Sequence, residues 1–215
     1  MYRNKASISD YYQAFLKSIE DMVIKSSDEY ILSTETSKII SDLIAKSGDS
    51  LFPIEFDTER KETMRHQKEM RTVPARMRES FYDHDDDKQF EYETIFVTIP
   101  ILPNTSIDII KGLGTSTFSM SWTPDDFKWT QDSVVLSIDI KGYGFKYDDQ
   151  QTINKVNELK KQIHEWVGWV NSDIKQGIGM IEKDLPPFVD GRKKKLDEDK
   201  NKLGDLSSKM GIALE

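Results

Sequence analysis

Apolar residues recur at helical spacing near the N-terminus. The first series, in steps of mostly three or four residues, comprises Tyr12, Phe15, Leu16, Ile19, Met22 and Val23. This spacing predicts an amphipathic helix with Ser9 or Asp10 at its N-cap. A second helix is predicted to begin between Ser33 and Thr36 and to end at Ser47-Gly48, because glycine favours the left-handed turn that closes many helices. Each helix has one apolar face and therefore needs a packing partner.

The middle of the chain has the alternation and the residue types of β-strands. The predicted strands are residues 90–101, 115–121 and 133–140, which are rich in β-branched and aromatic side chains. Leu51 to Phe56, interrupted by Pro53, is predicted to be an edge segment or a short strand. Turn residues separate the strands, and the connections are too short for helical crossovers, except at 105–111. These segments predict an antiparallel sheet.

The C-terminal third carries the most regular pattern. Nine apolar residues step by three or four: Ile153, Val156, Leu159, Ile163, Val167, Val170, Ile174, Ile178 and Ile181. This seam predicts a helix of about 30 residues, and its length leads us to expect self-association through the C-terminal helices. Asp184-Leu185-Pro186-Pro187 is predicted to break this helix and to start a second one, because proline lacks the N–H donor that a helix interior uses.

The predicted fold class is therefore α+β, with N-terminal helices, an antiparallel sheet and a long C-terminal antiparallel helical hairpin. We expect two regions. Residues 1–148 form the sheet-containing α+β region, and residues 149–215 form the hairpin, which packs on the first region or extends from it.

Composition and charge narrow the function classes. The net charge of −8 opposes general attraction to a phosphate backbone, so a nucleic-acid partner is disfavoured. The chain has no cysteine, which excludes disulfides, thiolate metal sites and a cysteine nucleophile. No apolar run has the length of a signal peptide's core or a membrane span, so we expect a cytoplasmic protein without a membrane partner.

One stretch of the chain is strongly basic. Residues 60–78 hold seven basic side chains against two acidic ones, and residues 83–93 that follow hold six carboxylates. Mutual pairing of the two segments is the interpretation we favour, since charge runs are usually solvated or paired. The alternative is a small-ligand or nucleic-acid site that uses Arg65, Lys68 and Arg71.

The remaining candidates for chemistry are few. His84-Asp85-Asp86-Asp87 offers metal ligands, but four consecutive residues point in different directions and no calcium-loop spacing surrounds them. Phosphate-binding, nucleophile-elbow and zinc-protease motifs are absent. We therefore assign no catalytic, cofactor-binding or metal residue and expect no cofactor, although unplaced carboxylate pairs leave a stand-alone hydrolase open.

Two tryptophans lie close together on the long helix. Trp166 and Trp169 are three residues apart, with glycines at 168, 177 and 179 in the helix interior, where glycine costs about 1 kcal/mol relative to alanine. Close packing against the sheet or a second helix is the simpler explanation. The alternative is an aromatic docking surface for another domain or subunit.

The order of these features resembles that of a known family. It is carried by Ser116-Thr117-Phe118-Ser119-Met120-Ser121, the Pro124 turn, a strand, Trp166, Val170-Asn171-Ser172-Asp173-Ile174, and then Arg192, Lys193, Leu196 and Gly211-Ile212. Residues 94–213 resemble the N-terminal module of bacterial anti-phage defence proteins, in which an endonuclease-like or other effector domain follows. Gly177-Ile178 departs from the family, which has an aromatic residue followed by asparagine there.

The resemblance implies a regulatory, non-catalytic module in antiviral defence that senses a trigger or assembles, and so positions an effector. The effector's catalytic residues would lie beyond residue 215 or on a partner. The expected partners are a second copy of the chain or the effector itself.

Overall fold

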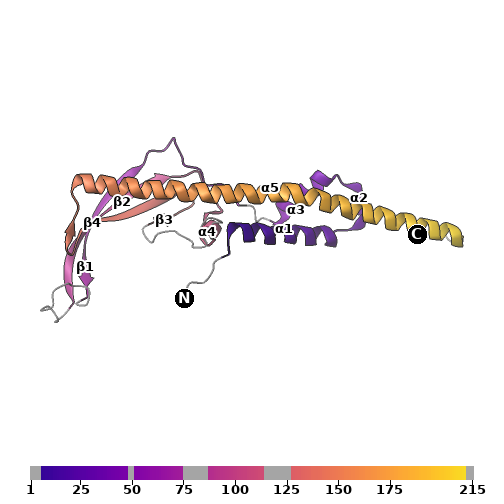
Figure 1. Cartoon of the computed structure of the whole chain (residues 1–215), viewed down its shortest axis with the longest axis horizontal. Coiled ribbons are helices and arrows are strands. Elements are labelled where there is room, and N and C mark those ends of the chain that lie inside the picture. Colours follow the sequence, from indigo (N-terminus) through magenta and orange to yellow (C-terminus); the bar gives the residue numbers. More distant parts are fainter. Residues whose placement is uncertain (1–5, 48–50, 75–86, 114–126, 212–215) are drawn as a thin grey trace. The chain divides into compact units, whose positions relative to one another are not determined.

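The computed structural model describes residues 6–47, 51–74, 87–113 and 127–211 (Figure 1). The helices are α1 (Ile8–Lys25), α2 (Asp28–Ser33), α3 (Thr36–Ser47), α4 (Ile107–Ile110) and α5 (Asp149–Met210). The strands are β1 (Thr63–Val73), β2 (Lys88–Pro100), β3 (Phe127–Trp129), β4 (Ser133–Gly142) and β5 (Phe145–Lys146). The predicted α+β class, with N-terminal helices, an antiparallel sheet and a long C-terminal helix, is confirmed.

The chain forms two compact units. One comprises Met1–Leu51 with Ser172–Glu215, and the other comprises Phe52–Asn171. Helix α5 contributes to both, so the sheet-containing unit includes the first part of this helix and the helical unit includes the rest. The predicted boundary between residues 148 and 149 therefore lies inside the second unit.

The helical unit begins with α1. Its N-cap is Ser7, and not the predicted Ser9 or Asp10: Asp10 lies at the third helical position and completes a capping box with Ser7. The buried side chains of α1 recur every three or four residues and are Ile8, Tyr12, Phe15, Ile19 and Val23. Helix α3 agrees with the second predicted helix, whereas α2, capped by Ser27, was not predicted because six residues carry too little periodicity.

Tyr12 is the largest fully buried side chain of this unit. Its hydroxyl donates to the carbonyl of Leu51 at 3.5 Å, and its ring lies directly against the backbone of Gly177 in α5. Burial raises the pKa of Tyr12 to about 12. The glycine at 177 therefore allows a close approach of α5 to the ring of Tyr12.

The second unit is built on an antiparallel sheet with strand order β1-β2-β4-β3, and β5 pairs with β4. Strands β1 and β2 are paired over their whole lengths, from Thr63 opposite Thr98 to Val73 opposite Lys88. The predicted strands at 90–101 and 133–140 are confirmed, and the predicted strand at 115–121 lies outside the described residues. The edge segment is reduced to one bridge between Phe56 and Ile101.

Alternate residues of the central strands form the core of this unit. The buried hydrophobic side chains that alternate along β2 and β4 are Ile95, Val97, Ile99, Val134, Leu136 and Ile138. The first part of α5 runs along the sheet (Figure 1) and buries Leu159, Ile163 and Val167 of the predicted seam. Two members of the seam differ: Ile153, its first residue, is 52% exposed and Ile178 is 38% exposed, whereas Ile181, its last residue, is 6% exposed.

The predicted break at residues 184–187 is wrong, and with it the helical hairpin. Helix α5 continues through Pro186 and Pro187 to Met210. A proline in a helix interior costs about 3 kcal/mol because it removes a hydrogen bond and clashes with the preceding turn. Leu185 and Val189, on either side of the prolines, are both fully buried. Their packing in the helical unit offsets the local cost and keeps the backbone helical.

Candidate functional site

Of the two tryptophans considered as a docking surface, Trp166 faces the core. It is 7% exposed, and its ring centroid lies 5.0 Å from that of Trp129 in β3, with the planes tilted by 44°. Trp169 is half-buried. The packing interpretation therefore holds for Trp166, and a docking role for Trp169 stays a prediction. The indole N–H of Trp129 is buried without a hydrogen-bond partner among the described residues.

The basic stretch lies largely on β1, where the described cations have partners. The ammonium group of Lys68 lies 2.9 Å from Glu93, the guanidinium of Arg65 stacks over Phe96 at 4.4 Å, and Arg71 pairs with Asp139 at 2.6 Å. The predicted pairing with residues 83–93 is thus present at Lys68, whereas Arg71 uses a carboxylate of β4. Residues 75–86, which include Arg76 and Arg78, lie outside the described residues.

Arg71 is the centre of a small polar network. Its guanidinium also donates to Thr94 at 3.0 Å, pairs with Glu69 and lies 4.7 Å from the ring centroid of Tyr92. Thr94 is only 1% exposed, and its hydroxyl donates to Asp139 at 2.5 Å. A side chain with this many partners ties β1, β2 and β4 together, which is a structural role.

Glu93 accepts hydrogen bonds from Lys68 and Lys141, which lower the pKa of its carboxyl group to about 2. The folded pKa lies below the unfolded value of about 4.3, so this group stabilises the fold above the unfolded pKa. That stabilisation is lost as the pH falls through the folded pKa. We expect the thermal midpoint to drop between about pH 5 and pH 2, and less steeply in Glu93→Gln.

Circular dichroism melts across this pH range measure the effect, with Glu59→Gln, an exposed residue, as the matched control. If the melting temperature of Glu93→Gln fell with pH in parallel with that of the unchanged protein, Glu93 would not contribute to the acid sensitivity of the fold.

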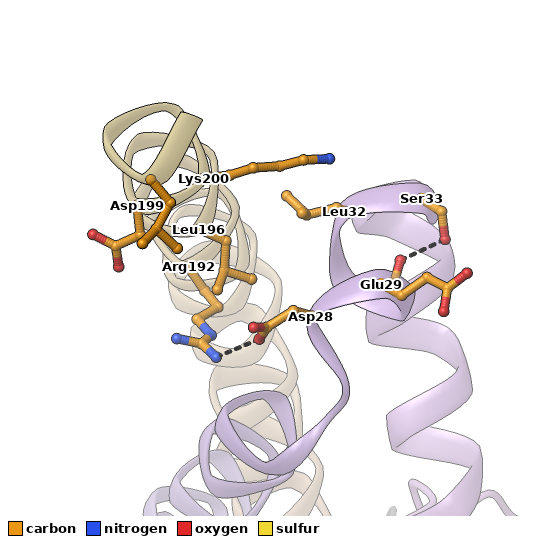
Figure 2. Close-up of a pocket in the computed structure, with 9 residues that line it drawn as sticks. Asp28, Glu29, Leu32, Ser33, Arg192, Leu196, Asp199 and Lys200 are labelled. Carbon is orange, nitrogen blue, oxygen red and sulfur yellow. Dashed lines mark hydrogen bonds and ion pairs between the residues drawn. The ribbon is translucent and has the colours of Figure 1, made fainter. Parts of the chain in front are cut away.

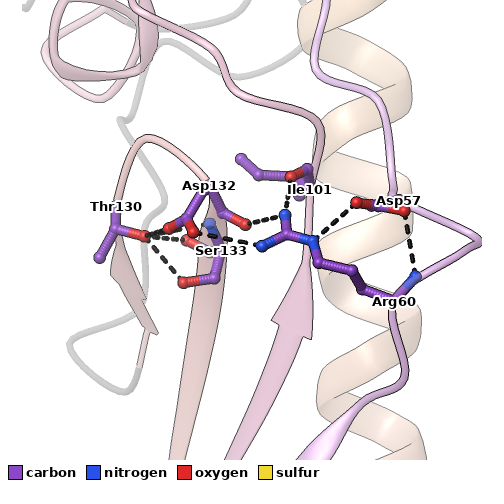
Figure 3. Close-up of polar contacts among 6 residues, drawn as sticks. All are labelled: Asp57, Arg60, Ile101, Thr130, Asp132 and Ser133. Atoms are coloured by element: carbon purple, nitrogen blue, oxygen red, sulfur yellow. Dashed lines mark hydrogen bonds and ion pairs between the residues drawn. The ribbon is translucent and has the colours of Figure 1, made fainter.

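Arg60 is fixed at the edge of the sheet (Figure 3). Its guanidinium donates to Asp57 at 2.7 Å, to the carbonyl of Ile101 at 2.5 Å and to the carbonyl of Asp132 at 2.9 Å. Asp57 in turn accepts the backbone N–H of Glu59 and of Arg60. Arg60 therefore joins the segment before β1 to the end of β2 and to the β3–β4 turn. The sequence shows only one more cation in a basic run, so this role could not be predicted.

The helical unit contains a groove of about 750 Å³ between α2 and the last part of α5. Its lining residues are Asp28, Glu29, Leu32, Ser33, Arg192, Leu196, Asp199, Lys200 and Leu203. Figure 2 shows Lys200 on the α5 side reaching toward the side of Leu32 on α2. The groove thus has apolar side chains in both walls, an acidic α2 rim and a cationic side chain on the α5 rim.

Polar contacts in and beside the groove join its two walls. Arg192 pairs with Asp28 at 2.9 Å, and Lys193 donates to the carbonyl of Thr34 at 2.6 Å. The hydroxyl of Thr36 donates to Asp190 at 2.6 Å. The basic residues 192 and 193 of α5 therefore bind α2 and the α2–α3 connection.

Toward its C-terminal end, α5 exposes apolar side chains that continue a stripe buried earlier in the helix. Leu185 and Val189 are fully buried and Leu196 is 8% exposed. The next members of the stripe are exposed: Leu203 by 54%, Leu206 by 53% and Met210 by 60%. A surface helix rarely exposes large apolar side chains on consecutive turns of the same face. We call Leu203, Leu206 and Met210 the terminal stripe.

The sequence does not point to the terminal stripe as a site, because in the predicted helical hairpin the apolar face of the second helix would pack against the first. A seven-residue step from Val189 through Leu196 and Leu203 to Met210 is the signal that could have identified it.

Two further observations concern the described residues only. They contain no group of three or more His, Cys, Asp or Glu side chains arranged to hold a metal ion. His84, Asp85 and Asp86 lie outside them. None of the described helices combines the length and the apolar character that a bilayer crossing needs.

Comparisons with known proteins identify no relative of this chain. No family model matches it, and neither a curated protein nor a solved structure is significantly similar. The structure by itself defines an α+β protein whose long C-terminal helix forms one wall of a partly apolar groove.

Proposed function

We propose that the chain is a non-catalytic assembly module that binds another protein through the groove and the terminal stripe. The observation that carries the proposal is the passage of one helical stripe from full burial at Leu185 and Val189 to more than half exposure at Leu203 and Leu206. Exposed apolar surface beside a groove marks protein–protein contact sites. The resemblance to defence proteins suggests that the bound protein is an effector, and a cytoplasmic location accords with the absence of cysteine.

Two rival functions have less support. For nucleic-acid or small-ligand binding through residues 60–78, the described cations Lys68 and Arg71 would have to exchange carboxylate partners for a ligand. For self-association through the predicted seam, most of the seam is already buried within the chain, with Ile153 and Ile178 as its exposed members. Self-association stays a prediction.

The test is protection against phage by the gene in a bacterium that carries it with its neighbouring genes. We expect Leu203→Asp with Leu206→Asp to abolish protection, because an aspartate cannot be buried in an apolar contact without a large desolvation penalty. The matched control is Asn201→Asp with Ser208→Asp, which adds the same charge on the opposite, exposed face of α5.

Both double variants should keep their thermal midpoints, since all four side chains are exposed or half-exposed. Equal protection by the two variants would contradict a role for the terminal stripe. Unchanged phage plating after deletion of the gene would contradict the defence assignment.

A further inference from the structure

The terminal stripe is bordered by lysines on both sides. With Leu196, Leu203 and Met210 at heptad position a, and Leu206 at d, the flanking e and g positions follow from the helix geometry. These positions are Lys193, Lys195, Lys200, Lys202, Ser207 and Lys209. The nearby carboxylates Asp197, Glu198 and Asp205 lie at b and c positions, toward the opposite face. The flanking e and g positions therefore carry lysines and one serine, although the chain as a whole carries −8. The d position between Leu196 and Leu203 is Asp199, which is a carboxylate within the stripe and lies 3.7 Å from Lys202.

Most of this positive charge is not neutralised within the part of the chain that the structure describes. Lys195, Lys200 and Lys209 make no hydrogen bond or ion pair with another described residue. Lys202 lies 3.7 Å from Asp199, a pair between two exposed side chains that contributes little. This contrasts with the sheet, where Lys68 and Lys141 both share Glu93.

Flanking charges select the partner of a helical stripe. In a parallel pair of helices g positions face e positions, and in an antiparallel pair g faces g and e faces e. A second copy of this α5 segment would set lysine against lysine in either orientation, and like charges disfavour such pairing. A helix with glutamate or aspartate beside its own apolar stripe would instead form an ion pair at each flanking position.

An anionic membrane surface would also attract lysines around an apolar stripe. The groove argues for a protein instead, because a helix can lie in the hollow between α2 and α5, whereas a flat lipid surface would contact only the groove's rims. Leu32 on α2 also gives the groove a second apolar wall, which suits a helix lying between α2 and α5.

We propose that the terminal stripe and its lysine flanks bind an acidic amphipathic helix of a partner protein. This inference rests on the proposed function and adds the chemistry of the partner. Apolar side chains of the partner cover Leu203, Leu206 and Met210, and its carboxylates pair with Lys195, Lys202 and Lys209. The carboxylates select the partner and the apolar contacts hold it.

Two synthetic peptides test the proposal against the full chain by fluorescence anisotropy. Both have about four heptads with leucine at a and d, one with glutamate and the other with lysine at every e and g position. Each peptide repels its own copies, which keeps it available for binding. We expect the glutamate peptide to bind at least about tenfold more tightly than the lysine peptide, and to weaken as salt rises.

Charge reversal at Lys195, Lys202 and Lys209 to glutamate should invert this preference. The matched control reverses Lys17, Lys38 and Lys175, which are exposed in the same unit but lie away from the stripe. It changes the net charge equally and should retain the preference for the glutamate peptide. Circular dichroism of both triple variants checks that α5 still folds.

Other outcomes would overturn the inference. Equal binding of both peptides, lost in Leu203→Asp with Leu206→Asp, would leave the proposed function standing and remove the charge selection. A dimer in analytical ultracentrifugation that this leucine variant dissolves would make a second copy the occupant. If the protein sedimented with vesicles of phosphatidylserine and phosphatidylcholine but bound neither peptide, the occupant of the terminal stripe would be a membrane. Absence of binding to all of these would remove the site.

Discussion

Gly177→Ala is expected to destabilise the helical unit strongly. The new methyl carbon would overlap the ring of Tyr12, a side chain that is only 1% exposed. Overpacking of a buried site costs typically about 1 to 3 kcal/mol, and more where the surroundings cannot relax. Because the ring lies on α1 and the glycine on α5, the strain falls on the contact that joins these two helices.

Urea denaturation followed by circular dichroism measures this loss. Gly179→Ala is the matched control, since its added methyl group has no atom within 4 Å apart from its own helix and chain neighbours. It should stabilise the protein by up to about 1 kcal/mol, because alanine favours the helix over glycine. If Gly177→Ala were as stable as Gly179→Ala, the close contact between α1 and α5 would be refuted.

Trp166→Ala is expected to cost about 3 to 5 kcal/mol of folding free energy. The change removes a buried indole that packs against Trp129, and it leaves a cavity between α5 and β3. Trp169→Ala should cost less, because Trp169 is only half-buried. Thermal melts of the two variants compare these losses, and loss of the tryptophan pair is followed by near-ultraviolet circular dichroism.

The same two variants decide what remains of the aromatic docking hypothesis. If Trp169 anchors a partner, Trp169→Ala should weaken protection against phage while sparing the melting temperature. Equal destabilisation by both substitutions, with protection unchanged, would make the pair a core feature only.

The charged residues illustrate where sequence reasoning is limited. Local counting shows that residues 60–78 are basic and that residues 83–93 are acidic, and the hairpin of β1 and β2 does place Lys68 beside Glu93. It does not show that Arg71 reaches Asp139, 68 positions away, or that Arg60 reaches Asp132. These pairs depend on the order of strands in the sheet, and sequence distance carries no information about that order.

What the sequence determined by itself is the set of elements with strong periodicity: α1, α3, β2, β4 and the seam of α5. Each repeats its apolar residues at the spacing of one secondary structure, so local pattern and burial agree. The sequence also contains the seven-residue step and the lysines of the terminal stripe, whose meaning depends on which side chains the fold covers.

Tertiary structure decided the remainder. It carried α5 through Pro186 and Pro187, because burial of Leu185 and Val189 outweighs a local penalty that the sequence alone makes look decisive. The fold places the ring of Tyr12 against Gly177, which explains the glycine at this position. It also leaves Leu203 exposed, whereas the predicted hairpin would have covered this side chain. In each case the outcome depends on contacts between distant segments, whose energies exceed the local preferences of about 1 to 3 kcal/mol on which sequence patterns rest.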